Sequence, residues 1–460
     1  MARLVADDIG DAVVEWISTT VGPIRSIDRQ QRWRPAWFVT AESKGRPVRL
    51  YVRGNREGFG FAGVEAEAAI LREMENHGIP VPHVHGVIAD GAAVVMDWLS
   101  GEADLSSAAD AVEIDAVMDD YVDALVRAHR IDPAAFADIG LRVPTGAHGV
   151  ALDYFETFVE RYRSFKQRPE PLLEFAIGWL RRNPPTHRST PRFVLGDTGQ
   201  FMFAEGRITG LLDVELAHIG DISHDLAGLR LRNVTEPMGD LGRVLRRYAE
   251  VSGEPLDVAS IEFHTAKFAL CTPLGVALVL HLDLPLLDIV QYIEWFHQLS
   301  LHAIESIARL SDVELAPVSL PDPVRSRYDG VIGGLSTMVE SLDVSAGITE
   351  YQRGSVASVA RFCHRVSEFG DAIDRADLAD IEATTRLGST DRRAADQALE
   401  AFILDAGPEH DAALVQLLHR RVMRQLLLLE PLLSGGRIGH VAPLAELLAS
   451  EAPVTAQRSR

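Results

Sequence analysis

The stretch from residue 191 to residue 229 constrains the fold more than any other part of the chain. It reads PRFVLGDTGQFMFAEGRITGLLDVELAHIGDISHDLAGL and sets two short apolar runs, FMF and ITGLLD, around the turn AEGR. A turn of this length predicts a tight antiparallel hairpin in which Phe203 pairs with Ile208. The same register pairs Gln200 with Leu211. We therefore predict a short β-hairpin inside a region that is otherwise helical.

Polar residues gather at one end of this hairpin. The register places Asp213 roughly opposite Thr198, close to Asp197 and Gln200. Phosphoryl transfer requires a carboxylate that orients a hydroxyl nucleophile, and an amide and a second carboxylate that hold Mg²⁺ on the nucleotide phosphates. A simpler interpretation is that Asp197 forms a local turn and Asp213 caps the following helix. Both interpretations remain open from these residues alone.

Length and composition define the broad class of protein. At 460 residues the chain exceeds the roughly 250–300 residues at which a single hydrophobic core stops growing, so two or three domains are expected. A hydrophobic content of 47% is that of a globular protein. The two cysteines, Cys271 and Cys363, follow neither metal-binding nor redox spacing, which favours a reducing, cytoplasmic compartment.

Charge and hydropathy argue against two kinds of partner. The formal net charge of −21 argues against nucleic acid. The N-terminal run MARLVADDIGDAVVEW is typical of an amphipathic helix and not of a signal peptide. The longest apolar run, residues 268–280, is shorter than the ~20 residues of a membrane span and predicts a buried helix. No membrane association is expected, and no feature indicates an oligomeric state.

Turn residues and periodicity divide the chain into segments. Residues 24–100 contain several extended runs and one helical run, over residues 63–78, that ends at a glycine. Two of the extended runs meet at Lys44-Gly45, as in a hairpin. We predict a β-rich nucleotide-binding lobe (1–100), a helical lobe with the hairpin (101–310), a proline-containing linker (311–323) and a helical accessory domain (324–460).

The motif LGDTGQFMF…GLLDVELAHIGDISHDLAGL resembles the catalytic segment of the aminoglycoside-phosphotransferase-like kinases. That segment runs His-Gly-Asp, about five residues, Asn, a strand, Ile/Leu-Asp-Trp-Glu, Gly-Asp and Asp-Leu-Ala. EPMGDLGRVLRRYAEVSGEPLD and FHTAKFALCTPLGVAL resemble the branch that accompanies acyl-CoA dehydrogenases in hydroxyacyl-CoA catabolism. The resemblance covers roughly residues 20–310. It implies an α+β, two-lobed protein-kinase-like fold, here with an appended C-terminal all-α domain.

The resemblance assigns roles to the acids of the motif. It implies that Asp197 is the catalytic base and that Asp213 binds Mg²⁺. Glu215, which follows in the same segment, is assigned to the metal site as well. Asp221 and Asp225 correspond to the structural acids of the family.

In the N-terminal lobe the resemblance implies a nucleotide site. Arg53 stands where kinases place a phosphate-binding base on the third strand, and Glu67 matches the helix glutamate that pairs with it. The hinge, whose backbone meets adenine, corresponds to Met96, Asp97 and Trp98. From the residues alone, Arg53 is equally typical of a surface strand and Glu67 of a solvated helix face.

The motif departs from the family pattern in two places. Leu195 replaces the family histidine. Two residues are missing between Asp197 and the position of the family asparagine, where Gln200 stands. The strand register keeps Gln200 near Asp213, so its amide oxygen is expected to ligate Mg²⁺. A loop two residues shorter displaces Asp197 by several ångströms unless it tightens, and even ~1 Å costs ~100-fold in rate.

The turn expected to cover the phosphates also departs from the pattern. IDRQQRWRPAW lacks the glycines that let backbone N–H groups approach phosphate. It carries Arg29, Arg32 and Arg34, and arginine can clamp phosphate bidentately. We assign Arg32 and Arg34 to the nucleotide site. The alternative is lost nucleotide binding.

These features predict ATP- and Mg²⁺-dependent phosphorylation of a hydroxyl on a small molecule. A hydroxyacyl-CoA is the favoured acceptor by resemblance. An aminoglycoside-type cation is the enzymatic alternative, which the acidic net charge favours. A pseudokinase that binds a ligand or partner without phosphoryl transfer is the second alternative. The C-terminal run YQRGSVASVARFCHRVSEFGDAID resembles a small helical protein that accompanies these kinases, and a plain helical bundle is the other interpretation.

Overall fold

The chain folds into two compact units. The computed structural model describes residues 5–30, 34–55, 63–88, 91–281, 288–324, 326–344 and 349–449. The first unit contains Met1–Asp153, Thr186–Asp257 and Pro443–Arg460, and the second contains Tyr154–Pro185 and Val258–Ala442. Helix α5, Gly146–Phe165, belongs partly to each.

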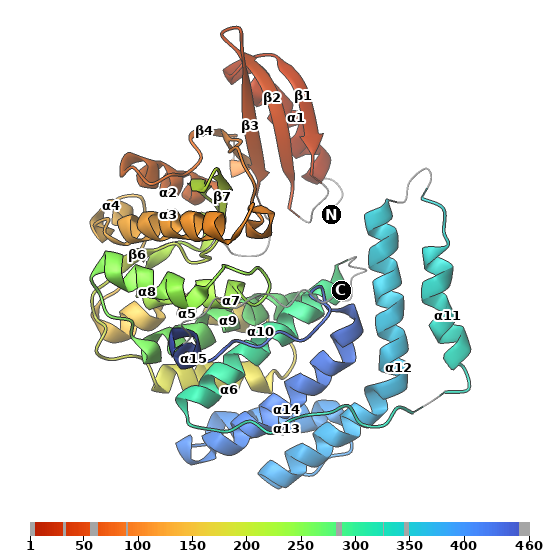
Figure 1. Cartoon of the computed structure of the whole chain (residues 1–460). Helices are drawn as coiled ribbons and strands as arrows, with labels where there is room; N and C mark the ends of the chain where they lie inside the picture. Colours follow the sequence, from red (N-terminus) through yellow and green to blue (C-terminus); the bar gives the residue numbers. More distant parts are fainter. Residues whose placement is uncertain are drawn as a thin grey trace. The chain divides into compact units, whose positions relative to one another are not determined.

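The first unit begins with a five-stranded antiparallel sheet in the order β1-β2-β3-β5-β4 (Figure 1). The strands are β1 Ile24–Arg29, β2 Ala36–Ser43, β3 Arg46–Gly54, β4 Val84–Val87 and β5 Ala93–Asp97. Lys44 and Gly45 join β2 to β3 with φ values of 51° and 76°. Two positive φ values are typical of the tight hairpin turn that matches the twist of the strands. The hairpin predicted at this point is therefore present.

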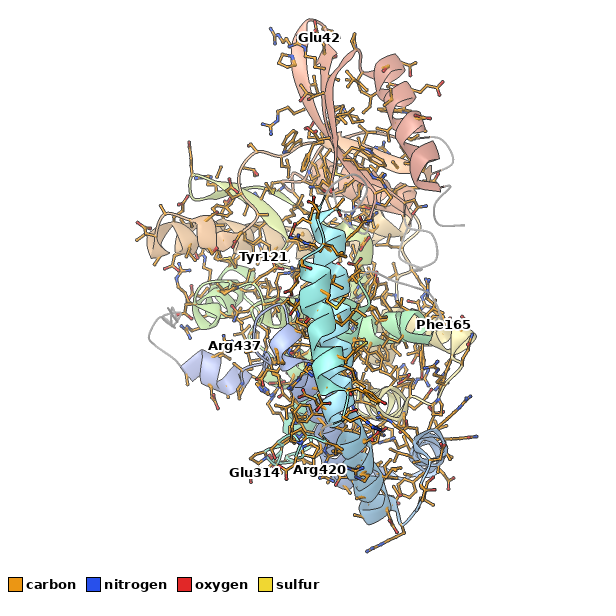
Figure 2. The ribbon with its side chains drawn as sticks, turned by 90° about the vertical axis from the view of Figure 1, so that its right-hand side faces the viewer. Glu42, Tyr121, Phe165, Glu314, Arg420 and Arg437 are labelled. Carbon is orange, nitrogen blue, oxygen red and sulfur yellow. The ribbon has the colours of Figure 1, made fainter. Side chains whose placement is uncertain are left out.

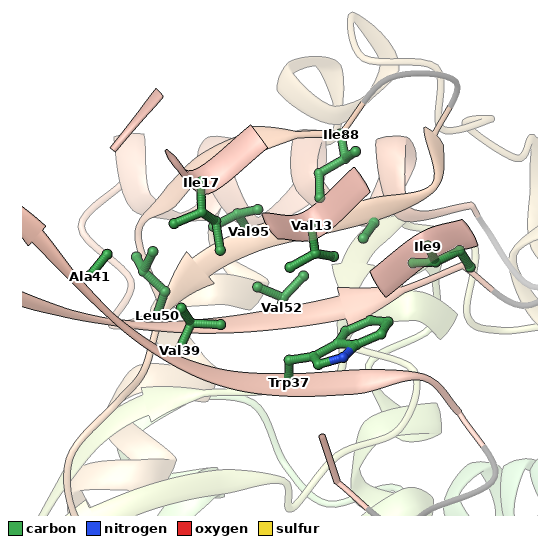
Figure 3. Close-up of a cluster of buried hydrophobic side chains, with 11 residues drawn as sticks. Ile9, Val13, Ile17, Trp37, Val39, Ala41, Leu50, Val52, Ile88 and Val95 are labelled. Atoms are coloured by element: carbon green, nitrogen blue, oxygen red, sulfur yellow. The ribbon is translucent and has the colours of Figure 1, made fainter. Parts of the chain in front are cut away.

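One face of the sheet is covered by α1, Val5–Thr20. Ile9, Val13 and Ile17 recur every four residues and form one apolar stripe on this helix. The stripe packs on buried residues of the sheet and its connections (Figure 3), namely Trp37, Val39, Ala41, Leu50, Val52, Ile88, Ala93 and Val95. The amphipathic N-terminal helix expected from the sequence is thus the cover of this core.

The next helix, α2 Val64–Asn76, confirms the helix predicted over residues 63–78. It ends where Gly78 takes a φ of 72°, and the Ile79 N–H donates to the carbonyl of Met74 at 3.0 Å. Its buried face includes an acid, Glu67. Because side chains alternate along a strand, Arg53 points to the sheet face opposite the α1 core.

The hairpin predicted between two apolar runs is also present, with a different register. Its strands are β7 Phe201–Ala204 and β8 Arg207–Leu211. Phe203 pairs with Ile208 as expected, but Leu211 pairs with Phe201 and not with Gln200. The register shifts because Thr209 is an extra residue, a β-bulge that two-residue periodicity cannot reveal.

The bulge corrects the predicted alignment of the polar residues. The Leu212 N–H donates to the Gln200 carbonyl at 2.9 Å, so Gln200 lies opposite Leu212. Asp213 then follows next to Gly199, one residue from the position expected opposite Thr198. The polar end of the hairpin is retained because the shift is only one residue.

The remaining elements of the first unit are mainly helices. They are η2 Leu105–Ser107, α3 Ala111–His129, α4 Pro133–Ala137, η3 Val214–Leu216, α7 Ser223–Arg232, α8 Leu241–Ser252 and α15 Leu444–Ala449, with a strand pair β6 Arg192–Val194 and β9 His218–Gly220. Helix α15 packs on α8, where Arg246 Nη1 donates to the carbonyl of Leu448 at 3.1 Å. The last described residues therefore belong with the first unit.

Among the described residues of the second unit, the regular secondary structure is helical. Its helices are α6 Pro171–Arg182, α9 Val258–His281, α10 Ile289–Leu310, α11 Asp329–Glu340, α12 Glu350–Thr385, α13 Arg392–Asp405, η4 Pro408–His410, α14 Asp411–Leu429 and η5 Glu430–Leu432. Helices α9 and α10 pack on α6, and α10 packs on α14. The packing units thus differ from the predicted domain limits, which group α9 and α10 with the kinase lobe. The domain limits remain a prediction.

One described helix, Val258–Leu280 within α9, passes the length and hydropathy test for a membrane span. Of its most apolar window, 72% is buried inside the protein. This agrees with the buried helix predicted over residues 268–280. Its partners are the neighbouring helices of the second unit.

We expect Ile17→Ala to loosen the sheet by about 2–5 kcal/mol, because Ile17 is fully buried in the α1 core. Hydrogen exchange of the β2 and β3 amides, which reports on this lobe by itself, should become faster. Val14→Ala on the same helix, at a side chain that is 41% exposed, should change the stability by no more than about 0.5 kcal/mol. Equal effects of the two substitutions would show that α1 does not stabilise the sheet.

Candidate active site

Arg53 and Glu67 form the ion pair that the sequence predicts. Arg53 lies on β3 and Glu67 on α2, and Arg53 Nη1 lies 2.6 Å from Glu67 Oε1. The two residues are 8% and 1% exposed, which rules out a surface arginine and a solvated helix face. Burial raises the pKa of Glu67, and Arg53 and Arg34 oppose that shift. A charge buried this deeply is stable only when it is paired.

The pair is part of a larger network of two arginines and three acids. Arg53 Nη2 lies 2.5 Å from Asp213 Oδ1 and 3.3 Å from Glu215 Oε2. Arg34 Nη1 lies 2.6 Å from Glu215 Oε2, and its Nη2 lies 3.3 Å from Glu67 Oε2. Two positive and three negative groups leave one net negative charge. Oxygen donors and a local negative charge suit a divalent cation.

Arg34 reaches this network and not a phosphate-covering turn. Its side chain is buried, and its Nε donates to the Gly54 carbonyl at 2.9 Å. It holds Glu67 and Glu215, which explains its position without a nucleotide. Arg32 lies outside the described residues. Direct contact of either arginine with a phosphate remains a prediction.

Asp213 has a left-handed backbone, with φ 57° and ψ 59°. This conformation is costly for a residue with a side chain, and it concentrates at functional sites. Asp213 lies two residues after the end of β8, and its carboxylate accepts a hydrogen bond from Arg53. The simpler interpretation of Asp213 as a helix cap does not hold, because its side chain makes no capping hydrogen bond.

The loop that carries Asp197 is tight. This is one of the two outcomes expected for a shortened loop, the other being a displaced Asp197. Gly196 and Gly199 have φ values of 86° and 85°. A Cβ atom on Gly196 would lie 2.1 Å from the carbonyl oxygen of Leu216, so only glycine fits there. Gln200 Nε2 donates to Asp197 Oδ2 at 2.7 Å. The missing residues are therefore absorbed by the two glycines while Asp197 and Gln200 stay in contact.

Arg232 is a second partner of Asp197 that the motif did not predict. Its Nη2 donates to Asp197 Oδ1 at 2.6 Å, and its Nε donates to the Thr198 carbonyl at 2.8 Å. The Asp197 side chain is 31% exposed. Burial raises the pKa of Asp197 to about 6; Arg232 lowers it and Asp213 adds to the increase. A carboxyl group with a pKa near neutrality is suited to accept a proton.

The fully buried side chain of Asp225 stabilises the loop that carries Asp197. Asp225 accepts hydrogen bonds from the Leu195 and Gly196 N–H groups at 2.7 and 3.0 Å. His129 Nε2 lies 2.9 Å from the same carboxylate, and His224 Nε2 lies 3.0 Å from the Gly196 carbonyl. These two histidines support the loop that carries Leu195 in place of the family histidine. The structural role predicted for Asp225 fits this arrangement.

Further supports come from residues that no local motif indicates. The Gly199 N–H donates at 2.9 Å to Tyr121 Oη on α3 (labelled in Figure 2). Asp221, the other predicted structural acid, accepts from Arg188 Nε at 2.7–2.8 Å and caps the first turn of α7 through the Ser223 N–H. Tyr121 lies 78 residues from Gly199 along the chain, and His129 lies 96 residues from Asp225, so sequence spacing gives no signal for them.

A cavity of about 500 Å³ adjoins the ion-pair network and the hairpin. It is lined by seven residues that the sequence assigns to the site, namely Arg53, Glu67, Met96, Asp97, Trp98, Gln200 and Asp213. Asp197 is in contact with the lining residue Gln200 but does not line the cavity itself. The volume is within the range of small-molecule sites.

Aromatic side chains form the wall of this cavity on the sheet side. Phe38 and Tyr51 line it from β2 and β3, with ring centroids 5.2 Å apart. Trp98 stacks near Phe38 at 4.4 Å, and the Arg49 guanidinium lies 3.7 Å from the Trp98 ring centroid. Flat apolar walls of this kind suit a planar base.

The donors present fit Mg²⁺ held together with nucleotide phosphates. Asp213 supplies a carboxylate, and Gln200 keeps its amide oxygen because its nitrogen faces Asp197. The Glu215 carboxylate is already held by two arginines, and its role as a ligand remains a prediction. Within the described ranges no group of three or more His, Cys, Asp or Glu side chains could hold a metal ion alone. Phosphate oxygens would have to complete such a site.

An ion pair between a strand arginine, Arg53, and a helix glutamate, Glu67, lies beside a hairpin that carries Asp197, Gln200 and Asp213. This combination is typical of a two-lobed, kinase-like phosphotransferase. Residues 29–267, more than half of the chain, match the model of the APH phosphotransferase enzyme family. The chain belongs to this family and is by class a small-molecule phosphotransferase. The resemblance to the acyl-CoA-associated branch remains a prediction.

Comparison with solved structures finds phosphotransferases of low sequence identity. A putative aminoglycoside phosphotransferase from Ralstonia eutropha JMP134 is 17% identical, with 66% of this chain and 98% of that chain covered and a TM-score of 0.50. A thermostable mutant of aminoglycoside phosphotransferase APH(4)-Ia, in a ternary complex with ADP and hygromycin B, is 15% identical, with coverages of 66% and 100% and a TM-score of 0.48. Macrolide 2′-phosphotransferase MphH from Brachybacterium faecium is 16% identical, with coverages of 67% and 100% and a TM-score of 0.42. A comparison with curated proteins finds no match.

We expect Asp225→Ala to destabilise the first unit by about 3–5 kcal/mol, because two amides and an imidazole lose their buried acceptor. Unfolding by urea measures the loss. Glu236→Ala, which removes an exposed partner of Arg232 just beyond the end of α7, should cost at most about 0.5 kcal/mol. If the two substitutions cost the same, Asp225 does not support the loop.

Proposed function

We propose that the protein transfers the γ-phosphoryl group of ATP to a hydroxyl group of a small molecule. The observation that carries the proposal is the convergence of two predicted groups on one cavity. The ion pair of Arg53 and Glu67 comes from the sheet lobe, and Gln200 and Asp213 come from the hairpin. Asp197 adjoins them through its hydrogen bond with Gln200.

The adenine base is proposed to enter beside the segment after β5. The Asp97 and Trp98 N–H groups already donate to the carbonyls of His83 and Arg49, at 2.9 and 3.1 Å. The next residue, Leu99, lines the same cavity. Its backbone N–H is the donor proposed for the base. Phe38 would pack on its face.

Asp213 and Gln200 are proposed to hold the magnesium ion, and Arg53 to bind phosphate oxygens. Bound Mg²⁺ would neutralise the charge of the phosphates during transfer. Arg53 lies between Glu67 and Asp213, so its guanidinium is fixed in direction before a nucleotide arrives. Such fixed charges stabilise a transition state without rearranging.

Asp197 is the proposed base. Its carboxylate is oriented from two sides, by the Gln200 amide and the Arg232 guanidinium. Its pKa is raised to about 6, so at a pH above this value the carboxylate is ionised and able to accept the proton of the acceptor hydroxyl. Arg232 would then offset the negative charge near the phosphates.

Two classes of phosphate acceptor are proposed. The formal net charge of −21 favours a cationic, aminoglycoside-type acceptor through long-range attraction. The sequence resemblance favours a hydroxyacyl-CoA. A pseudokinase is the third possibility, and one observation favours it: in this structure Arg53 and Arg232 neutralise Asp213 and Asp197.

Asp197→Asn should lower kcat by about 100-fold or more, because the amide cannot accept the hydroxyl proton. ATP turnover is measured with aminoglycoside and hydroxyacyl-CoA panels. Asp123→Asn, an exposed aspartate on α3, is the matched control and should keep its rate. Should the wild type transfer no phosphate to either panel while Asp197→Asn still binds nucleotide, the protein is a pseudokinase.

Asp213→Asn should abolish the Mg²⁺ dependence of nucleotide binding, because it removes the carboxylate proposed to hold the ion. Titrations of ADP with and without Mg²⁺ measure the effect. Circular dichroism melting should remain cooperative in the variant. An unchanged Mg²⁺ dependence would count against Asp213 as a ligand.

A further inference from the structure

The second unit contains a cavity of its own, of about 620 Å³. It is surrounded by residues 168–170 and by helices α6, α9, α10, α12, α13 and α14. Figure 1 shows α6, α13 and α14 close together, and α6 contacts both of the others. Every lining residue belongs to the second unit, so the cavity is complete within it. The volume is that of a site for a small organic molecule.

A residue that lines this cavity has a buried hydroxyl group without a partner. Ser300 on α10 is 1% exposed and lines the cavity. Within the described part of the chain, its Oγ has no hydrogen-bond partner. Serine in a helix normally satisfies its hydroxyl on the preceding turn, and a buried polar atom left unpaired is destabilising. A ligand with a polar group at this depth would satisfy Ser300.

The walls beside Ser300 are apolar. Leu280, Phe296, Leu418 and Val422 line the cavity from α9, α10 and α14. His297 adjoins Phe296, and burial, with a contribution from Arg392, lowers the pKa of His297 to about 3. Its imidazole is therefore neutral at physiological pH. A ligand body that packs here is apolar.

Two other arginines that line the cavity, Arg421 and Arg392, are already neutralised. Arg421 pairs with Asp396 and, at 3.5 Å, with Asp377. Arg392 pairs with Asp374 and lies 3.9 Å from Asp377. These side chains serve the packing of α12, α13 and α14, so they are not available to a ligand.

Two arginines at the rim differ from the paired ones. Arg168 and Arg393 are exposed and line the cavity, and neither has a carboxylate partner among the described residues. The rim acids, Glu170 and Asp391, stand at the N-caps of α6 and α13, where the helix dipoles offset their charge. Asp391 also accepts from the Ala394 N–H at 2.8 Å. The rim therefore attracts an anion.

We propose that this cavity binds a small organic anion: a carboxylate held by Arg168 and Arg393, an apolar body, and a hydroxyl group that reaches Ser300. This orientation of the ligand follows from the burial of the three residues, since the arginines are exposed and Ser300 is buried. The site is independent of the phosphotransferase chemistry proposed above, and its occupant need not be the phosphate acceptor.

Calorimetric titration of the full-length protein with octanoate, octanamide and 8-hydroxyoctanoate tests the site. Octanoate should bind at one site, and octanamide at least ~10-fold more weakly, because charged hydrogen bonds to arginine are lost. The double variant Arg168→Gln/Arg393→Gln should weaken octanoate about 10-fold. Arg437→Gln, an exposed arginine outside the cavity (labelled in Figure 2), is the matched control.

A second comparison isolates Ser300. 8-Hydroxyoctanoate should bind several-fold more tightly than octanoate to the wild type, and Ser300→Ala should remove this advantage. Ser300→Leu, which fills the cavity, should abolish both. The proposal is overturned by no saturable octanoate binding at millimolar concentration, by equal binding of the amide, or by an unchanged preference in Ser300→Ala. Competition by ADP would place the probe in the nucleotide cavity and would also overturn it.

Discussion

The fold of the first unit depends on the burial of the Arg53 guanidinium. An ion removed from water is stable only with matched partners, and Arg53 has three: Glu67, Asp213 and Glu215. These partners come from α2 and from the segment that follows β8. Arg34, which precedes β2, forms ion pairs with two of them, Glu67 and Glu215. Neither lobe can move away without leaving a charge unpaired. The network therefore fixes the sheet lobe on the hairpin and directs the acids toward the cavity.

The same network has a functional consequence. Burial lowers the pKa of Arg53, but Asp213, Glu67 and Glu215 together raise it by more, so the net shift is upward and the guanidinium stays charged. Asp213 shares this cation while its backbone is held in a left-handed turn. A divalent cation would compete for the same carboxylate, and its binding would free part of Arg53 for phosphate. The resting state is thus an internal ion pair, and the proposed metal–nucleotide complex would take its place.

The sequence predicts much of this site and misses its supports. The hairpin with β7 and β8 and the hairpin turn at Lys44-Gly45 follow from local patterns, because each depends on neighbouring residues. The pair of Arg53 and Glu67 follows from the family resemblance, since the residues alone leave a surface position equally open. The bulge at Thr209 shifts the register by one and has no periodic signal. Arg232 and the histidines that hold the loop come from distant helices, and a charge in a helix gives no indication of its partner. Arg34 was assigned to phosphate because sequence cannot show which way it turns.

Pairing also separates structural charges from charges that are free to bind ligands in the second unit. The run His419, Arg420, Arg421 and Arg424 on α14 has the pattern of an anion site. In the structure its arginines are held by aspartates of α12 and α13, with Arg424 Nη1 2.7 Å from Asp377 Oδ1 and Arg420 Nε 3.0 Å from Asp380 Oδ2. Density of positive charge therefore does not locate a binding site. The cavity of the second unit differs, because Arg168 and Arg393 at its rim have no carboxylate partner among the described residues and Ser300 has an unpaired hydroxyl group. Only unsatisfied groups such as these gain free energy when a ligand binds.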